Sequence, residues 1–530
     1  MIAGNRRCAL STLIAVFLIF SLQLSLGRTA TRPGIAQVPV EEFQLDNGMR
    51  FLLVHRPEAT TVSVGWVTGA GSADDDPDAT GLSHLLEHLL FKGSRTVGSR
   101  DLGQELLVLE RQDQVWGQLM EVRDETVVAT GRKKEKLEQK ASKLQAELTT
   151  LQQQASSLAF LGQFSLFYSE QGATGLNANT FRDFTLYYVT VPSEKLESWF
   201  WLESDRLLEP VFRELYKEVQ VVHEERRLRI ESTPTGQLDE ELRGRFWGDH
   251  PYSWDTQGHS GHLDRIERAD AQAFFDRHYR SDNLTAALVG GFDPEQVRTW
   301  AQLYFGRLPR RPSPPTAGAP APIELRQVED RMSARCECPP QAQVLYPSPK
   351  FDHPDVPALQ VLAAVMNGRS GRLYRSLVLA QQIAFSAYTR QVSWRHAGEF
   401  SFRGETKGGV DPEELVLAWD RQLKLLQTKS VAEGELQRAK NRLAGEAFRS
   451  LKEPSALMKQ LLVYQGLGDW QHLNQWPHQV LAVSASDLMH VASLYLVPQR
   501  RTVALYRRNA AALFEADPRD TGTPDSEVAK

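Results

Sequence analysis

The most constraining feature of the sequence is a regular apolar repeat between residues 137 and 158. Seven small or large apolar residues follow one another at alternating steps of four and three: Leu137, Ala141, Leu144, Leu148, Leu151, Ala155 and Leu158. This spacing places one apolar stripe along a long helix, and a second helix must cover that stripe. Residues 102–122 form another helical stretch, with Thr130-Gly131 as a turn signal between the two. The sequence therefore predicts an inserted antiparallel helical hairpin, a coiled coil, over residues 101–158. A purely structural arm and an arm that docks a partner fit this pattern equally well.

The composition excludes several classes of protein. The chain has 530 residues, with 61 Lys+Arg and 66 Asp+Glu, so its formal net charge is −5. This length predicts several domains, and this mildly acidic balance gives no reason to expect a nucleic-acid partner. Three cysteines are too few for a disulfide scaffold. Cys336 and Cys338 are expected as free thiols or as a labile bridge, not as a metal site.

The N-terminal segment has the features of an export signal. Two arginines precede a nearly uninterrupted apolar run over residues 9–26, and Ser25 and Gly27 are the small residues that a signal peptidase requires. We therefore expect residues 1–27 to be a signal peptide and the rest of the chain to be exported. The run is also just long enough to remain as an uncleaved inner-membrane anchor.

A Pro-rich stretch over residues 308–323 is the clearest domain boundary, because its six prolines form a semi-rigid spacer. It separates an N-terminal domain (28–307) from a C-terminal domain (324–510), and a polar tail (511–530) follows. Apolar and β-branched runs between turn residues predict strands within residues 38–66, 174–192 and 283–291, and a helix over residues 193–208.

The segment His84-Leu85-Leu86-Glu87-His88 carries the sharpest chemical signal. On a helix, His84 and His88 lie one turn apart on the same face, with Glu87 close to that face. Two imidazoles so placed can supply two zinc ligands, and the carboxylate can act as a general base toward water. Leucines surround the three polar residues, whose burial is costly unless something pairs with them. This H-x-x-E-H order is the inverzincin signature.

A third zinc ligand has to come from another part of the chain. Residues 215–231 are a charged helical stretch in which Glu218 and Glu225 lie two turns apart on one face. Glu224 and His223 are rivals on other faces. Taken alone, this stretch fits an ordinary solvated helix, so the pattern leaves the third ligand open.

Three segments together resemble a known family: HLLEHLLFKG, GLNANTFRDFTLYYVTVP and VVHEERRLR are similar to the pitrilysin, mitochondrial processing peptidase and insulin-degrading enzyme family of zinc peptidases. The resemblance runs from about residue 38 to residue 497 and weakens after the Pro-rich stretch. It implies an α+β fold of two tandem homologous domains, each with a mainly antiparallel sheet flanked by helices, that together form half of a clamshell. The C-terminal domain contains no H-x-x-E-H and resembles the family's inactive repeat.

The resemblance also implies roles for individual residues. By this match the zinc ligands are His84, His88 and Glu225, and the catalytic carboxylates are Glu87, as general base, and Glu218, two turns before the third ligand. Glu225 is favoured over Glu224 because only Glu225 keeps the seven-residue step to Glu218. The interval from His88 to Glu225 is about sixty residues longer than the family's usual spacing, and the inserted hairpin accounts for the excess.

The implied function is a zinc metalloendopeptidase with one Zn²⁺ per chain, acting on extended or unfolded peptides. The family binds its substrate as an added edge strand, which here would contact Asn177, Ala178 and Asn179. Without the motif, that segment fits an ordinary solvent-facing edge strand. The alternative function is a non-catalytic peptide-binding or structural subunit of a peptidase-like complex, which the intact His84, Glu87 and His88 argue against.

The resemblance further implies partners and a location. Family members of this size act in pairs, and the inactive domain supplies an Arg and a Tyr to the substrate. Residues 377–385 match that position but offer no Arg, and Phe385 replaces the Tyr. We therefore expect a dimer and hypothesise a hetero-dimer with a related non-catalytic chain. The export signal and the family together favour the periplasm.

Two other polar groups fit structural explanations better than metal sites. The acidic run at Asp74, Asp75 and Asp76 lacks the alternating ligand spacing of a calcium loop and is expected to be solvated. His259 and His262, with Asp264 nearby, are expected to form a polar loop before a helix.

Overall fold

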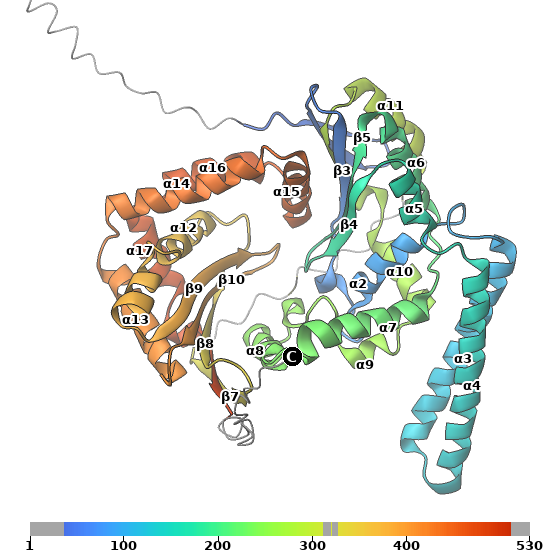
Figure 1. Cartoon of the computed structure of the whole chain (residues 1–530), viewed down its shortest axis with the longest axis horizontal. Coiled ribbons are helices and arrows are strands. Elements are labelled where there is room, and N and C mark those ends of the chain that lie inside the picture. The colour runs from blue at the N-terminus through green and yellow to red at the C-terminus, as the bar shows by residue number, and fades with distance from the viewer. Residues whose placement is uncertain (1–36, 311–319, 321–326, 510–530) are drawn as a thin grey trace, which may run out of the picture. The chain divides into compact units, whose positions relative to one another are not determined.

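Two β-sheets organise the chain, one in each half (Figure 1). The computed structural model describes residues 37–310, 320 and 327–509, and its part from Pro39 onward is one compact unit. The predicted signal peptide, the polar tail and most of the Pro-rich stretch lie outside the described residues. Among the described residues, no helix is long and apolar enough to cross a membrane.

The first sheet has six strands in the order β1-β2-β6-β3-β5-β4, of which only β2 and β6 pair in parallel. The strands are β1 (Glu41–Gln44), β2 (Arg50–His55), β3 (Thr61–Thr68), β4 (Thr174–Thr180), β5 (Thr185–Pro192) and β6 (Leu284–Gly290). The strands predicted within residues 38–66, 174–192 and 283–291 are therefore confirmed. β6 is buried along its whole length because β2 and β3 flank it, whereas β4 is an edge strand whose pairing partner among the described residues is β5 alone.

The described part of the first half has ten α-helices. They are α2 (Leu82–Leu89), α3 (Leu102–Val128), α4 (Gly131–Leu158), α5 (Gln163–Glu170), α6 (Leu196–Leu208), α7 (Leu215–Arg226), α8 (Gly236–Trp247), α9 (Ser260–Leu263), α10 (Arg268–His278) and α11 (Pro294–Tyr304). Of these, α2, α5 and α6 contact β4 or β5 of this sheet. The helix predicted over residues 193–208 is confirmed as a short 3₁₀ turn followed by α6. A π-helical turn, Arg227–Glu231, extends α7.

The second sheet has five strands in the order β7-β11-β8-β10-β9. The strands are β7 (Asp330–Cys336), β8 (Gln341–Ser348), β9 (Ala384–Ser393), β10 (Gly398–Thr406) and β11 (Thr502–Arg508). The helices are α12 (Val356–Met366), α13 (Pro412–Thr428), α14 (Glu433–Ser450), α15 (Pro454–Leu467), α16 (His472–Ala482) and α17 (Ala485–Tyr495). Cys336 and Cys338 form a disulfide, which is the bridged alternative of the two expected states.

The two halves repeat one topology. In the order β2-β6-β3-β5-β4 the first pair is parallel and the rest antiparallel, and β7-β11-β8-β10-β9 follows the same pattern. In each repeat, one strand pairs antiparallel with the last strand of that repeat: β3 with β6, and β8 with β11. A helix follows this strand in both repeats, so α2 after β3 corresponds to α12 after β8. The predicted α+β fold with two tandem repeats is confirmed.

Each half also lends a helix to the other sheet. α15 packs against β3 and β6 of the first sheet, where a Cβ at Gly65 would lie 3.1 Å from a methyl carbon of Leu462. In return, Asp239 of α8 accepts hydrogen bonds from Gln343 of β8 (2.7 Å) and Tyr506 of β11 (3.0 Å). The two repeats therefore share their packing.

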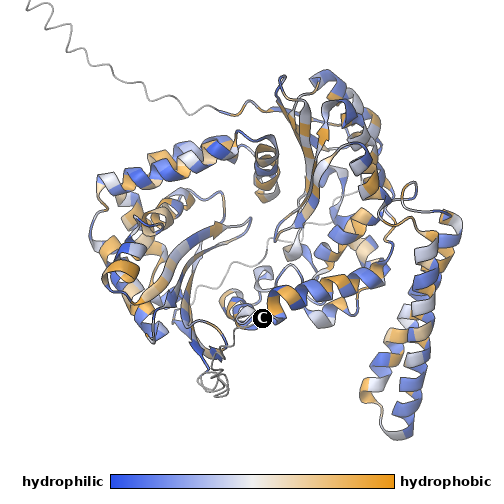
Figure 2. Cartoon of the chain, in the orientation of Figure 1, coloured by the Kyte–Doolittle hydropathy of each residue, from blue (hydrophilic) through white to orange (hydrophobic). Residues whose placement is uncertain are grey.

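The predicted inserted hairpin is present as α3 and α4, which pack along each other (Figure 1). All seven residues of the apolar repeat are buried or half-buried, and hydrophilic residues cover most of the outer surface of the hairpin (Figure 2). The hairpin is fixed to the first half by the buried ion pair of Glu105 with Arg213 (2.8 Å) and by stacking of Trp116 on Tyr216.

Candidate metal centre

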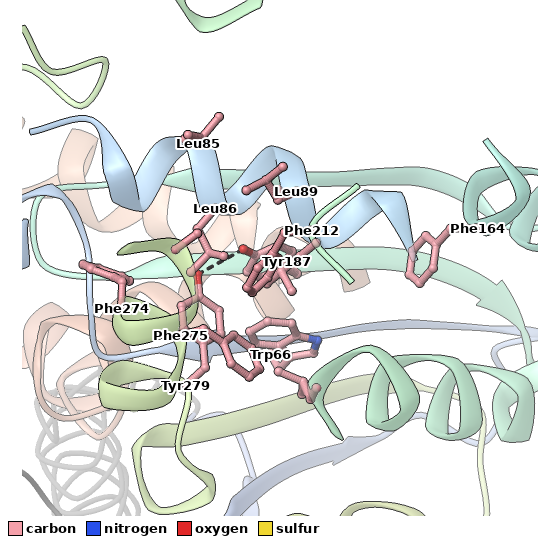
Figure 3. Close-up of a cluster of buried hydrophobic side chains, with 14 of the residues drawn as sticks. Trp66, Leu85, Leu86, Leu89, Phe164, Tyr187, Phe212, Phe274, Phe275 and Tyr279 are labelled. Atoms are coloured by element: carbon pink, nitrogen blue, oxygen red, sulfur yellow. Dashed lines mark hydrogen bonds between the residues drawn. The ribbon is translucent and has the colours of Figure 1, made fainter. Parts of the chain in front are cut away.

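The H-x-x-E-H segment forms most of α2, and the leucines of this helix fix its orientation. Leu85, Leu86 and Leu89 are fully buried, over an aromatic layer that includes Trp66 and Tyr187 (Figure 3). The hydroxyl groups of Tyr187 and Tyr279 hydrogen-bond within this layer at 3.1 Å. This packing of the leucines fixes the rotation of α2 about its axis, so His84, Glu87 and His88 lie on the opposite side of the helix.

Asp75 fixes the beginning of α2. Its carboxylate accepts hydrogen bonds from the backbone N–H groups of Gly81 and Ser83, each at 2.8 Å, and its exposed fraction is only 4%. Gly81 itself has φ = 94°, a left-handed conformation that favours glycine. The expectation that the whole acidic run is solvated is therefore wrong for Asp75, because unsatisfied N–H groups at the helix start need an acceptor. Burial raises the pKa of Asp75 to about 8, against these hydrogen bonds. The expectation is also wrong for Asp74, which is half-buried and accepts a hydrogen bond from the backbone N–H of Gly71 at 2.9 Å.

His84 and His88 present their rings on the same side of α2, as helical spacing predicts. The ring centroids lie 4.8 Å apart in an edge-to-face arrangement. His84 is buried, and burial together with the neighbouring His88 lowers its pKa to about 3. The ring of His84 is therefore neutral at physiological pH, which is the form that binds a metal ion.

α7 brings its carboxylates against the two histidines. The Glu225 carboxylate lies 3.8 Å from Nε2 of His84 and 3.5 Å from Nε2 of His88. The ligand atoms of His84, His88 and Glu225 all lie within 4.8 Å of one another, and this is the only such group of three found among the described residues.

Glu218 orients the His88 ring through Nδ1, the nitrogen that does not face Glu225. One oxygen of its carboxylate lies 3.2 Å from Nδ1 of His88, and the other accepts a hydrogen bond from Lys92 at 2.6 Å. Lys92 also contacts Glu214 at 3.2 Å. Burial raises the pKa of Glu218, but the hydrogen bonds from His88 and Lys92 outweigh this effect and hold it below its usual value. A hydrogen bond to Nδ1 leaves Nε2 of His88 directed at Glu225.

Glu87 lies on the same helix face, with an exposed fraction of 9%. Thr180, at the end of β4, donates a hydrogen bond of 2.5 Å to its carboxylate. Burial raises the pKa of Glu87 above its usual value, although the hydrogen bond from Thr180 and the charge of His88 oppose the shift. A carboxyl with a raised pKa is suited to accept and return a proton near neutral pH.

The donor set fits zinc. One oxygen of Glu225 is buried and has no hydrogen-bond partner among the described residues, although it faces His84 and lies 3.5 Å from the guanidinium of Arg229. Ligand atoms bound tetrahedrally to one zinc ion at about 2.0–2.1 Å lie roughly 3.4 Å apart, close to the distances of 3.5 and 3.8 Å here. Two nitrogens and one carboxylate oxygen are also a ligand set of catalytic zinc sites.

The rival ligands point elsewhere. Glu224 is exposed and ion-paired to Arg227 at 2.8 Å, and His223 contacts Asp264 at 3.0 Å. His262 contacts Thr80 at 2.9 Å. His259 precedes the short helix α9 and fits the expected polar loop, whereas His262 lies within α9. The pattern left the third ligand open, and the packing of α7 on α2 brings Glu225 to the histidines.

A cavity of about 520 Å³ opens beside the cluster and reaches the edge strand β4. Asn177 and Asn179 are exposed and Ala178 is buried, so alternate side chains point outward and into the core. Asn179 accepts a hydrogen bond of 3.1 Å from Tyr188 of β5. The backbone of β4 pairs with β5 on one edge only, which leaves the other edge beside the cavity for a ligand strand.

The second half offers no equivalent cluster among the described residues. Leu377 is fully buried, whereas Phe385 at the start of β9 has an exposed fraction of 73%. An exposed phenyl ring can contact a ligand through its face, but it has no hydroxyl group with which to donate a hydrogen bond.

Comparison with known proteins agrees with this geometry. The sequence matches the description "Insulinase (Peptidase family M16)" over residues 50–114, which contain the H-x-x-E-H segment. It matches "Peptidase M16 inactive domain" over residues 265–443. This chain belongs to peptidase family M16. The resemblance of the three sequence segments to this family is therefore confirmed.

Relatives in this family are named as zinc proteases. The chain is 21% identical to the Bacillus subtilis "Uncharacterized zinc protease YmxG", over 79% of this chain and 86% of that protein. It is 24% identical to the "Zinc protease PqqE" of Helicobacter pylori, over 65% of this chain and 79% of that protein. The homologues are thus zinc proteases by name.

Solved structures of the family share the fold. A protease from Helicobacter pylori superposes with a TM-score of 0.72 at 20% identity, over 89% of this chain and all of that chain. The periplasmic protease PqqL from Escherichia coli gives a TM-score of 0.64 at 14% identity, over 90% of this chain and 49% of that chain. These likenesses support the two-domain family fold.

Proposed function

We propose that this chain is a zinc metalloendopeptidase that hydrolyses extended or unfolded peptides. The observation that carries the proposal is the convergence of His84, His88 and Glu225, whose ligand atoms lie within 4.8 Å of one another. Glu87 lies on the same face of α2, and the cavity beside it reaches an unpaired strand edge. Membership of a family whose named relatives are zinc proteases supports the same function.

The chemistry divides between the metal and the chain. Zinc, when held by His84, His88 and Glu225, supplies a Lewis acid that polarises the scissile carbonyl and makes water more acidic. Glu87 accepts a proton from the attacking water and passes it to the leaving amine. Thr180 fixes the direction of the Glu87 carboxylate through its hydrogen bond. Glu218 acts through His88, whose ring it orients, and so is a positioning residue.

The edge strand β4 is the proposed substrate contact. An extended peptide added to this strand would pair with the backbone of Asn177, Ala178 and Asn179. Thr180, the next residue of the same strand, contacts Glu87, so a peptide aligned on β4 has its backbone beside the general base. Backbone pairing requires an extended chain and is indifferent to most side chains, which favours unfolded substrates.

The first test compares the parent chain with Glu87→Gln for bound zinc and for cleavage of an unstructured quenched peptide. Gln keeps the shape of the side chain but cannot accept the proton, so we expect zinc to remain and cleavage to fall by about 10²–10⁴-fold. Glu224→Gln, on the exposed side of α7, is the matched control and should cleave normally. Zinc in the parent chain without cleavage, alone or with a partner, would favour a non-catalytic peptide-binding subunit. Absence of zinc would reject the metal site.

We also propose that the active form is a dimer, and we hypothesise that it is a hetero-dimer with a related non-catalytic chain. The support is that residues 377–385 lack an Arg and carry Phe385 where the family resemblance implies a Tyr. If a second chain completes the site, specific activity should fall on dilution and rise when that chain is added. Full activity at every concentration would reject this hypothesis.

We propose an exported, periplasmic location. The apolar run over residues 9–26 supports export, and a structural neighbour named as a periplasmic protease supports the compartment. Cell fractionation with N-terminal sequencing tests the location and also distinguishes cleavage after Gly27 from an uncleaved inner-membrane anchor.

A further inference from the structure

The tip of the α3–α4 hairpin exposes two adjacent apolar side chains. Val127 and Val128, the last residues of α3, have exposed fractions of 84% and 81%. These are the highest values of any large apolar side chain in the part of the chain that the structure describes. Both valines stand at the free end of a long arm, where the apolar seam between α3 and α4 does not cover them.

Basic residues follow directly on the other side of the turn. Residues 125–143, which include the end of α3, contain six basic and three acidic side chains, in a chain of net charge −5. The six basic residues are Arg132, Lys133, Lys134, Lys136, Lys140 and Lys143, and all are exposed. The ion pairs that α3 and α4 make with described residues, those of Glu105, Arg111, Asp113 and Asp124, involve none of these six.

The position of these cations is unfavourable for the hairpin itself. Arg132, Lys133 and Lys134 occupy the first turn of α4, which has no acidic residue. The aligned peptide dipoles give a helix N-terminus a partial positive charge, so cations there lower the stability of the helix. Packing of α3 on α4 depends on the apolar residues of the repeat, and lysines at the start of α4 contribute nothing to that packing. A ligand outside the hairpin would explain them.

We propose that the hairpin tip, residues 125–143, binds the surface of an anionic phospholipid bilayer. The lysines meet the negatively charged headgroups, while Val127 and Val128 enter the boundary between headgroups and acyl chains. A nucleic acid, or a protein surface that is acidic throughout, would pair with the lysines but would offer no apolar environment to the two valines. The combination of apolar tip and basic flank therefore favours a lipid surface.

The length of the arm allows this contact to be tested apart from catalysis. Helices of 27 and 28 residues extend roughly 40 Å at 1.5 Å per residue. The tip is thus far along the arm from its base, where Ser99 pairs with Ala159, and none of its residues lines the cavity beside the metal cluster. Substitutions at the tip should leave zinc content and peptidase activity unchanged.

The experiment measures binding of the full chain to vesicles by flotation. Two kinds of vesicle are compared, one of phosphatidylcholine alone and one that also contains phosphatidylglycerol. The parent chain is compared with a charge-reversed variant (Lys133→Glu, Lys134→Glu, Lys136→Glu) and with a double variant, Val127→Ser plus Val128→Ser. The matched control reverses three exposed lysines of the second half: Lys407→Glu, Lys424→Glu and Lys429→Glu. Because the N-terminal apolar segment could bind vesicles by itself, an environment-sensitive dye at Thr130→Cys, with Cys8→Ser, reports contact of the tip directly.

We expect the dye at residue 130 to shift on anionic vesicles only, and to shift less at high salt. The charge-reversed tip should bind at least tenfold more weakly, since each lysine near an anionic surface contributes about a fivefold gain in affinity. The double serine variant should also lose binding, and the control should stay within twofold of the parent chain. An unchanged dye spectrum, or an equal loss in the control, would overturn the proposal. Binding of the tip to RNA or to an acidic protein with no response to vesicles would overturn it as well.

Discussion

α2 and α12 occupy equivalent positions in the two repeats, and they differ in what the neighbouring helix presents to them. Every residue of α12 except Gln360 is buried, and the helix contains no ionisable residue. α2 buries its leucines in the same way but carries His84, Glu87 and His88 on the side that faces α7. Burial of this helix is thus a property of the fold that both repeats share. The chemistry of the site depends on the helix packed beside it, which is α7 in the first repeat and α14 in the second.

These neighbouring helices make opposite contributions. α7 presents Glu218 and Glu225 to the histidines of α2. α14 instead presents Arg442, whose guanidinium donates hydrogen bonds to the backbone carbonyls of Ala364 and Asn367 at the end of α12. A guanidinium there satisfies helix-end carbonyls, which is a structural role. Carboxylates beside histidines form a metal site. The following predictions test this contrast, from the largest expected effect to the smallest.

Glu225→Ala should remove one of the three proposed ligands. We expect loss of stoichiometric zinc and a fall in peptidase activity to the background level, measured by metal analysis and by peptide cleavage. Glu224→Ala, one residue earlier and exposed, should leave both unchanged. Normal zinc content in Glu225→Ala would contradict the proposed ligand set.

Lys92→Met should weaken the site without removing a ligand. Lys92 holds Glu218, which orients His88, so we expect zinc affinity to fall about 10–100-fold. Competition with a zinc chelator measures this change. Lys217→Met is the matched control, because Lys217 also contacts Glu214 but is exposed and does not touch Glu218. Equal effects of the two substitutions would mean that loss of a nearby positive charge lowers zinc affinity, and that the hydrogen bond from Lys92 to Glu218 does not matter.

Arg442→Met should have the opposite signature. Removing the guanidinium leaves the carbonyls of Ala364 and Asn367 without this partner, so we expect a loss of about 1–3 kcal/mol of stability. Urea unfolding measures it, and zinc affinity should remain unchanged. A fall in zinc affinity as large as that of Lys92→Met would remove the contrast between the two repeats.

Asp75→Ala should destabilise the start of α2. Loss of the acceptor for Gly81 and Ser83 N–H groups should cost about 0.5–2 kcal/mol, as for other helix caps. Thermal unfolding of the zinc-free chain measures the effect. Asp76→Ala, at the exposed neighbouring position, should change stability little, and equal losses would mean that the cap is unimportant.

His278 of α10 should give a dependence of stability on pH. Burial, with Arg277 and Arg280 nearby, lowers the pKa of His278 to about 4 from 6.5. The unfolded chain therefore binds this proton at higher pH than the folded chain does, so stability falls as the pH drops from about 6.5 to about 4. After discounting for partial exposure we expect about 1 kcal/mol. His278→Gln should reduce this slope in urea unfolding of the zinc-free chain, whereas His490→Gln on the equivalent helix α17 is the control.

The sequence by itself determined the local features. The hairpin follows from the repeat at residues 137–158, because a helix puts residues three and four apart on one side. The same rule places His84, Glu87 and His88 on one side of α2. Strands were predictable from apolar runs between turn residues. These features depend on backbone geometry over a few residues, which a sequence states directly.

Only the tertiary structure decided which distant side chains meet. Without the family resemblance, Glu224 and His223 were as eligible as Glu225, and the approach of α7 to α2 brings Glu225 to the histidines. Thr180 and Lys92 carried no signal of their contacts with Glu87 and Glu218. Asp75 was misread because a run of three acids is ordinarily solvated. Contacts between elements far apart in sequence depend on how helices pack on a sheet, and local periodicity does not contain that information.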